Sequence, residues 1–252
     1  MTQRVLLMSS SRKDNLGYLE HATEQIHALL EKKPARIAFV PYAGVTFSFD
    51  EYEGRVKPVF EQLGYSLSSI HHRNIDPCQA IEEADAIAVG GGNTFALLKR
   101  MYDANIVDLI RRKVRAGTPY IGWSAGSNVA CPTICTTNDM PIVQPPTLRS
   151  LGLVPFQINP HFISGKPAGH NGESREERLA EFLHINAPET LIALSEGSAL
   201  LCGDDAAKVL GERGALRFAT DGSTVAIGEN ETFQFSSVKG PAGFSDWPDF
   251  TI

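Results

Sequence analysis

The sequence predicts an α/β fold, in which a mostly parallel sheet is covered by helices on both faces. Short apolar runs alternate with amphipathic stretches over the first two thirds of the chain. The runs are apolar throughout rather than at every second position, which is typical of strands buried on both faces. After residue 185 short runs are separated by turns, which predicts an antiparallel meander at the sheet edge.

The elements follow one another in a regular order. Strands are expected at 4–9, 36–44, 65–70, 84–93 and 118–123, and helices at 18–33, 50–64, from Pro77, at 94–104 and at 106–117. Pro58 lies inside the second helix, where we expect a kink. There is no repeat and no low-complexity linker, so we expect one domain over 1–252, with about 237–252, rich in Gly and Pro, as a tail or a lid.

Charge and composition exclude several classes of protein. The net charge is −6 and no dense run of Lys and Arg is present, which argues against nucleic-acid binding. The first apolar run, 5–8, is too short for a membrane span or the core of a signal peptide, so we expect a cytoplasmic protein without a membrane partner. Four cysteines without a C-x-x-C pair indicate reduced thiols rather than a zinc site.

The run Gly122-Trp123-Ser124-Ala125-Gly126 ends a predicted strand and precedes a probable helix. A G-x-S-x-G run in that context is typical of a nucleophile elbow, a sharp turn that exposes the serine oxygen. Glycine is expected on both sides because a side chain there would collide with the neighbouring strand and helix. The sequence therefore predicts Ser124 as a nucleophile at the carboxyl edge of the sheet.

The nucleophile needs a base, and the base needs an acid that orients it. His161 follows the apolar run "LVPFQINP", and Glu196 stands at the end of "TLIALSEG", so both are expected at strand ends. Asp139, in a loop, is a competing acid. The other histidines are weaker candidates: His21, His27, His71 and His72 are interpreted as solvated or capping residues, His170 lies in a Gly-rich loop, and His184 ends a helix.

An oxyanion hole requires backbone N–H groups near the serine. Ala125, directly after the nucleophile, supplies one. The run "AVGGGNTF", residues 88–95, lets backbone approach a substrate closely and is the expected source of the second. A nucleotide-binding interpretation of this run is weak, because it has neither G-x-G-x-x-G spacing nor a Walker lysine.

Several motifs together resemble the peptidase E family of serine peptidases. They are "GGGNTF", "YIGWSAGSN", "ACPTICTTNDMPI", "QINPHF", "GHNGESREER" and "SEGSAL", and the resemblance extends over about residues 5–235. It implies a flavodoxin-like or glutamine-amidotransferase-like fold. It also implies a triad of Ser124, His161 and Glu196, with Gly92 and Ala125 as oxyanion donors. The implied activity is cytoplasmic hydrolysis of dipeptides with an N-terminal aspartate, with no metal or organic cofactor.

Such a substrate needs a cation for its side-chain carboxylate. Arg175 is the first candidate, followed by His170 and Lys166; Asn93 is a further candidate for substrate contact. The substrate ammonium needs an acidic partner, for which Asp139 and Glu173 are candidates. A homo-oligomer is compatible with the sequence.

Three other functions are alternatives to this one. A cyanophycinase-like hydrolase would cut a β-linked aspartyl-arginine polymer on a similar scaffold. A non-catalytic flavodoxin-like protein would bind a ligand without a reactive serine. A glutamine-amidotransferase-like enzyme would carry cysteine at the elbow, where this chain has Ser124.

Overall fold

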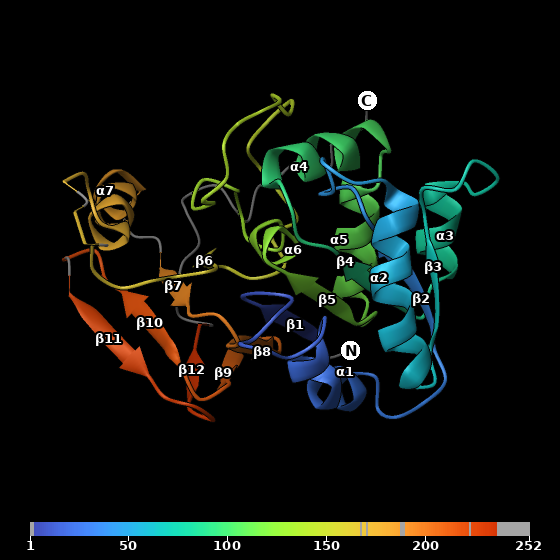
Figure 1. Cartoon of the computed structure of the whole chain (residues 1–252), viewed down its shortest axis with the longest axis horizontal. Helices are drawn as coiled ribbons and strands as arrows, with labels where there is room; N and C mark the ends of the chain where they lie inside the picture. The colour runs from blue at the N-terminus through green and yellow to red at the C-terminus, as the bar shows by residue number, and fades with distance from the viewer. Residues whose placement is uncertain (1–2, 167, 170, 187–189, 222, 236–252) are drawn as a thin grey trace.

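The computed structural model describes residues 3–166, 168–169, 171–186, 190–221 and 223–235, which form two β-sheets (Figure 1). The larger sheet has the strand order β12-β9-β8-β1-β5-β4-β2-β3 and the smaller one β11-β10-β7-β6. The region predicted as a tail or lid, 237–252, lies outside the described residues. Within the part described, every helix is too short or too polar to span a bilayer.

The larger sheet contains the predicted parallel strands. They are β1 (Val5–Met8), β5 (Tyr120–Trp123), β4 (Ala86–Val89), β2 (Arg36–Val40) and β3 (Ser66–Ser69). Three antiparallel strands continue the sheet beyond β1: β8 (Ala199–Cys202), β9 (Ala206–Leu210) and β12 (Thr232–Gln234). The fold is therefore α/β, with a sheet that is parallel from β1 to its edge at β3 and antiparallel on the other side of β1.

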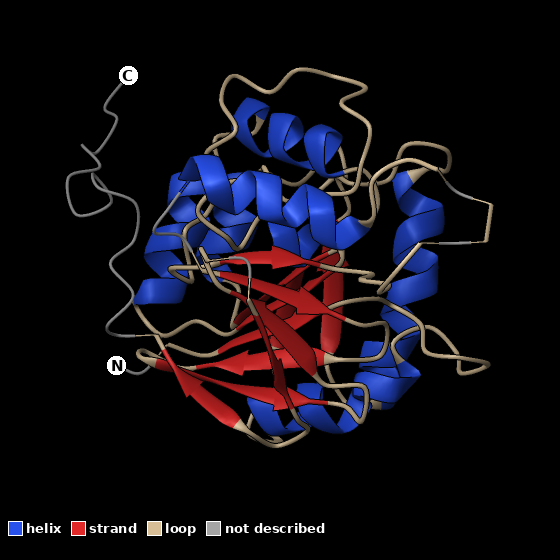
Figure 2. Cartoon of the chain, turned by 90° about the vertical axis from the view of Figure 1, so that its left-hand side faces the viewer, coloured by secondary structure: helices blue, strands red, loops and turns tan. Residues whose placement is uncertain are grey.

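Helices cover both faces of the larger sheet, as the uniformly apolar strands predict (Figure 2). One face packs against α1 (Thr23–Leu29), preceded by the 3₁₀ turn η1 (Glu20–Ala22), and against α2 (Phe49–Gln62). The other face packs against α3 (Pro77–Glu83), α4 (Thr94–Asp103) and α5 (Val107–Arg115). Along β1, Leu6 and Met8 point to the first face and Val5 and Leu7 to the second, so each residue is buried whichever way it points.

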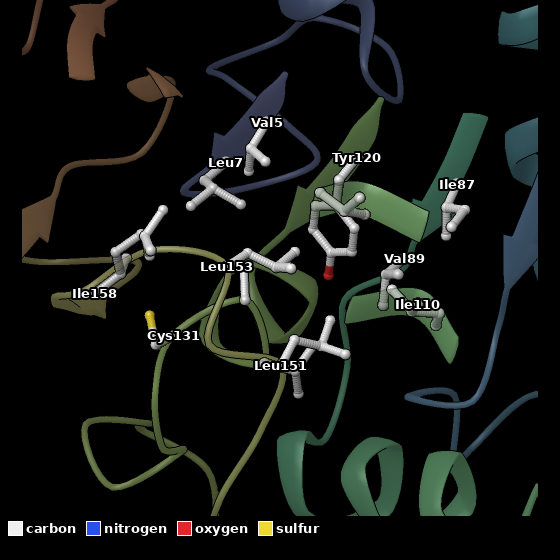
Figure 3. Close-up of a cluster of buried hydrophobic side chains, with 14 of the residues drawn as sticks. Val5, Leu7, Ile87, Val89, Ile110, Tyr120, Cys131, Leu151, Leu153 and Ile158 are labelled. Atoms are coloured by element: carbon white, nitrogen blue, oxygen red, sulfur yellow. The ribbon is translucent and has the colours of Figure 1, made fainter. Parts of the chain in front are cut away.

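The second face forms the larger core (Figure 3). Ile87, Val89 and Tyr120 of the sheet meet Ile110 of α5 there. The long segment between the elbow helix that follows Ser124 and the next strand contributes Cys131, Leu151 and Leu153. This core extends to Ile158 of β6 (Gln157–Asn159) in the smaller sheet. The two sheets are therefore packed together through one apolar cluster.

The C-terminal third divides between the two sheets rather than staying at one edge. Strands β8, β9 and β12 join the larger sheet. Strand β7 (Leu191–Leu194) pairs in parallel with β6, and β10 (Ala215–Phe218) and β11 (Thr224–Ile227) follow it in antiparallel order. Helix α7 (Arg175–Asn186) covers this sheet through Leu179 and Leu183. Figure 1 shows β6 and β7 beside the carboxyl end of β5.

Candidate active site

Ser124 lies at the turn between β5 and α6 (Ala125–Asn128), as the elbow motif predicts. Its backbone has φ 52° and ψ −113°, a conformation that a residue other than glycine adopts only under constraint. Backbone hydrogen bonds on both sides of Ser124 impose this conformation. The Ser124 N–H donates to the Met8 carbonyl at 3.0 Å, and the Ser124 carbonyl accepts from Ser127 and Asn128. The serine side chain is thus presented outward at the start of the helix.

The two flanking glycines are required by close backbone contacts. A Cβ at Gly122 would lie 2.6 Å from the Gly126 carbonyl oxygen, and a Cβ at Gly126 would collide with the Val89 carbonyl oxygen. Neither neighbour is a flexible side chain that could move aside. The expected steric reason for G-x-S-x-G is therefore present in the structure.

His161 and Glu196 lie next to this serine in one hydrogen-bonded chain. The distance from Ser124 Oγ to His161 Nε2 is 3.0 Å, and the distance from His161 Nδ1 to Glu196 Oε1 is 2.8 Å. Both side chains are accessible, with 39% of His161 and 51% of Glu196 exposed. The arrangement can transfer a proton from the serine to the imidazole while the carboxylate orients the ring.

The pairing of β6 with β7 brings the histidine and the glutamate together. The strands are parallel, with Asn159 opposite Ala193, so their carboxyl ends meet at one edge. His161 lies two residues after β6 and Glu196 two residues after β7. His161 also has a positive φ of 54°, which turns its side chain out of the strand direction.

Ser9 connects the larger sheet to this pair, and the sequence analysis missed it. It follows β1, is fully buried, accepts a hydrogen bond from the His161 N–H at 2.9 Å and donates to the Leu194 carbonyl at 2.9 Å. One hydroxyl thus binds the backbone both at His161 and at Leu194, the last residue of β7. The sequence signal was only a run of three serines after the first strand, which does not reveal which of them bridges the sheets.

The glycine-rich run lies against the nucleophile. A Cβ at Gly91 would be 2.9 Å from Ser124 Cβ. Gly92 has φ 137°, and a Cβ there would collide with the Ala43 carbonyl oxygen. The Gly91 carbonyl accepts a hydrogen bond from Tyr52 Oη at 2.8 Å. In a trans peptide the N–H points opposite to the carbonyl, so the Gly92 N–H points away from Tyr52. Burial raises the pKa of Tyr52 well above its ordinary value, so this hydroxyl stays a donor.

Asn93 and Asp139 lie at the start of α4. The Asn93 side chain caps the helix by accepting from the Ala96 N–H, and it donates to the Met140 carbonyl. Asp139 Oδ2 accepts from the Thr94 N–H at 2.7 Å and from the Thr94 hydroxyl. The competing acid is therefore hydrogen-bonded to a helix terminus, whereas Glu196 is hydrogen-bonded to the histidine.

Arg175 begins α7 and is half-buried. Its guanidinium donates to Asn159 Oδ1 at 3.4 Å, and Asn159 is the last residue of the strand that leads to His161. No carboxylate in the described part of the chain forms an ion pair with it. Burial and the neighbouring Arg178 lower its pKa from the ordinary value, so the guanidinium lies in a site that favours an incoming anion.

The remaining candidates lie elsewhere or cannot be placed. Lys166 pairs with Glu177 at 2.9 Å, and Glu173, which precedes α7, lies 3.9 Å from Arg178 of that helix. His170 lies outside the described residues.

Known proteins with similar sequences show the family of this chain. The model of peptidase family S51 matches residues 5–210. The chain belongs to peptidase family S51. It is 51% identical over 234 residues to peptidase E of Haemophilus influenzae (strain PittGG), and 50% identical over 234 residues to peptidase E of Pasteurella multocida (strain Pm70). Each alignment covers 92% of this chain and 100% of the relative.

A solved structure is also similar in fold. The peptidase from an acI-B1 Actinobacterium superposes with a TM-score of 0.64 at 18% identity, over 93% of this chain and 98% of that chain. At that identity the likeness concerns the fold alone. The family and the fold together identify the chain as a peptidase with the expected α/β architecture.

Proposed function

We propose that this S51 peptidase is a serine-type dipeptidase that cuts dipeptides after an N-terminal aspartate, in the cytoplasm. The observation that carries the serine type is the chain of contacts from Ser124 Oγ through both nitrogens of His161 to Glu196 Oε1, at 3.0 and 2.8 Å. A serine at a strained strand-to-helix turn, a base within hydrogen-bond reach and an acid on the far nitrogen form a nucleophilic triad.

In the first half of the proposed reaction Ser124 Oγ attacks the carbonyl carbon of the substrate aspartate. Its proton passes to His161 Nε2, and Glu196 accepts a hydrogen bond from the His161 Nδ1–H and stabilises the imidazolium. The tetrahedral intermediate then breaks its C–N bond, and the imidazolium gives its proton to the departing amine. The second amino acid leaves, and the aspartyl group remains as an ester on Ser124.

In the second half a water molecule attacks the ester carbon while His161 takes its proton. The C–O bond to Ser124 breaks, the proton returns to the serine oxygen, and free aspartate leaves. Atoms and charge balance without a cofactor, because the histidine receives and returns one proton in each half.

The negative oxygen of both intermediates is proposed to bind the N–H groups of Ala125 and Gly92. Ala125 is the first residue of α6, where N–H groups have no partner within the helix. The Gly91–Gly92 peptide is held by Tyr52 through its carbonyl, with the Gly92 N–H on the opposite side. Donors fixed in advance in this way stabilise the transition state without rearrangement.

Specificity for aspartate is proposed to depend on Arg175. Its guanidinium is half-buried beside Asn159 and forms no ion pair with a described carboxylate, so a substrate carboxylate would be its counter-ion. For the substrate ammonium we propose Asp139, because Thr94 engages its Oδ2 and a carboxylate has a second oxygen that can accept a hydrogen bond.

Hydrolysis of a small substrate panel tests the proposal. The purified protein should cleave Asp-Leu, cleave Glu-Leu and Asn-Leu much more slowly, and leave acetyl-Asp-Leu intact because it lacks the ammonium group. Covalent labelling by a fluorophosphonate, followed by peptide mapping to Ser124, tests the serine type separately. Cleavage of the aspartyl-arginine polymer in preference to Asp-Leu would replace the proposal with a cyanophycinase-like activity, and an absence of labelling together with inactivity would support a ligand-binding protein.

A further inference from the structure

A second cluster of reactive side chains lies outside the triad, between the first turn of α2 and the end of β3. It consists of Asp50, Glu53, His71 and His72, and one potential ligand atom of each lies within 4.8 Å of those of the other three. Asp50 and Glu53 are three residues apart on one face of the helix. The two histidines follow the edge strand of the larger sheet. We propose that these four side chains form a binding site for a divalent transition-metal ion, with Zn²⁺ as the expected ion.

The distances are close to those of a metal site. His71 Nε2 is 3.0 Å from Asp50 Oδ1, and His72 Nε2 is 2.7 Å from Glu53 Oε2. Ligand atoms around tetrahedral zinc are about 3.3 Å apart when the bonds are about 2.0–2.1 Å. The two hydrogen-bonded pairs therefore already have close to the required spacing, and the four ligand atoms, all within 4.8 Å of one another, would move closer together around one ion.

The charge of the cluster also favours a bound cation. Two carboxylates face two imidazoles, and in the described part of the chain no lysine or arginine pairs with Asp50 or Glu53. Glu53 is 8% exposed, so its charge is largely removed from water. Burying a carboxylate is costly unless it is paired or bound to a metal. A divalent ion would neutralise both carboxylates at once.

Ser69 positions two of the proposed ligands from behind. This fully buried residue donates its N–H to Glu53 Oε1 at 3.0 Å, and its Oγ lies 2.6 Å from His71 Nδ1. The contacts leave Glu53 Oε2 and His71 Nε2 directed at the cluster. A ligating histidine usually donates its second N–H to such an oxygen atom, and a hydroxyl can accept this hydrogen bond as readily as donate one.

The ligand types select the metal. Imidazole with carboxylate suits Zn²⁺, Co²⁺ or Ni²⁺, whereas Mg²⁺ and Ca²⁺ prefer oxygen alone. The cysteines, whose spacing argued against a zinc site, take no part. Strand β3 has only β2 as a neighbour in the sheet. An ion bound between α2 and the residues after β3 would therefore stabilise this edge strand.

Titration calorimetry of the untagged full-length protein with ZnCl₂ tests the site. We expect one Zn²⁺ per chain, no competition by Mg²⁺, and a rise in Tm on binding. Asp50→Asn and His71→Asn should each weaken Zn²⁺ binding by at least about 10-fold, and Ser69→Ala by about 10-fold, as is usual for groups that orient a ligand. Asp50 is well exposed, so its variant tests the site even if His71→Asn fails to fold.

Two matched variants serve as controls. Asp108→Asn removes another aspartate from the first turn of a helix, and His184→Asn removes an exposed histidine from α7; neither should change Zn²⁺ binding. The visible spectrum of the Co²⁺ form should change in His71→Asn and not in the controls. The proposal is wrong if the wild-type protein binds no Zn²⁺. It is also wrong if binding survives in the His71→Asn/His72→Asn double variant, or is lost only in His161→Ala, which would place the ion at the triad.

Discussion

The two sheets contribute to the site in different ways. The larger sheet supplies the nucleophile from a fully packed region, where Trp123 and Ala125 on either side of Ser124 are buried. The smaller sheet supplies the base and the acid from two accessible strand ends, with 39% and 51% of the side chains exposed. The position of the serine is therefore set by close packing, and that of the histidine and glutamate by strand pairing and a few hydrogen bonds. We expect changes on the two sides to have effects of different size.

The largest effect is expected on the side of the larger sheet. Ser124→Ala removes the proposed nucleophile and should lower the kcat for Asp-Leu by about 10⁴- to 10⁶-fold. Among the described residues the Ser124 hydroxyl contacts His161 Nε2, an accessible side chain, so the circular dichroism spectrum and Tm should stay close to those of the wild type. Retention of more than about a tenth of the activity would remove Ser124 from the mechanism.

On the side of the smaller sheet the acid should matter less. Glu196→Gln keeps the shape but removes the charge that stabilises the imidazolium, and we expect a fall in kcat of about 10²- to 10³-fold. This expected fall in kcat is smaller than that for a buried acid, because water screens the charge of a half-exposed carboxylate. Asp139→Asn is the comparison: it should act mainly on KM. If Asp139→Asn lowers kcat more than Glu196→Gln while KM is unchanged, the acid is wrongly assigned.

The same difference explains what could be predicted from the sequence. The elbow was predictable because its signal is local: Gly122, Ser124 and Gly126 lie within five residues, and the backbone contacts that require the glycines are made by neighbouring elements. The apolar runs likewise predicted the parallel strands, since a strand buried on both faces has a distinct composition.

The pairing of β6 with β7 was not predictable in this way. His161 and Glu196 are 35 residues apart, and nothing local says that their strands are neighbours in a second sheet. Ser9 and Tyr52 were missed for the same reason. Their roles come from hydrogen bonds to His161 and Gly91, which are 152 and 39 residues away in the sequence. The periodicity of apolar residues does not predict such long-range hydrogen bonds.

Substrate recognition sharpens the comparison, because Arg175 belongs to the smaller-sheet side. Arg175→Met should lower kcat/KM for Asp-Leu by about 30- to 1000-fold, the effect of losing a guanidinium–carboxylate pair in a partly closed site. Cleavage of Asn-Leu, whose amide does not use the charge, should change little. Arg178→Met, an exposed arginine on the same helix, is the control. An equal loss for both substrates would mean that Arg175 supports the strand end at Asn159 without contacting the side chain.

A smaller effect is expected when the glycine-rich run loses its anchor. Tyr52→Phe removes the hydroxyl that holds the Gly91 carbonyl, so the proposed Gly92 donor loses its fixed orientation. We expect kcat to fall by about 10- to 100-fold, less than the loss of an oxyanion donor itself, with KM nearly unchanged. Tyr42→Phe alters another buried tyrosine, which packs in the core on the other face of the larger sheet, and should keep full activity. Equal activity of Tyr52→Phe and the wild type would remove this tyrosine from the positioning of the donor.

The smallest effect should come from the contact that joins the two regions. Ser9→Ala leaves the His161 N–H and the Leu194 carbonyl without the hydroxyl that connects them. A buried polar group without a partner destabilises the fold by about 1–3 kcal/mol. Loss of the hydrogen bond should also let His161 move away from Ser124. We therefore expect a fall in kcat of about 5- to 20-fold at unchanged KM, together with a lower Tm. Ser198→Ala is the matched control, because Ser198 is equally buried and its hydroxyl has no hydrogen-bond partner among the described residues. If both variants lose the same stability and neither loses kcat, the smaller sheet holds its histidine without help from the larger one.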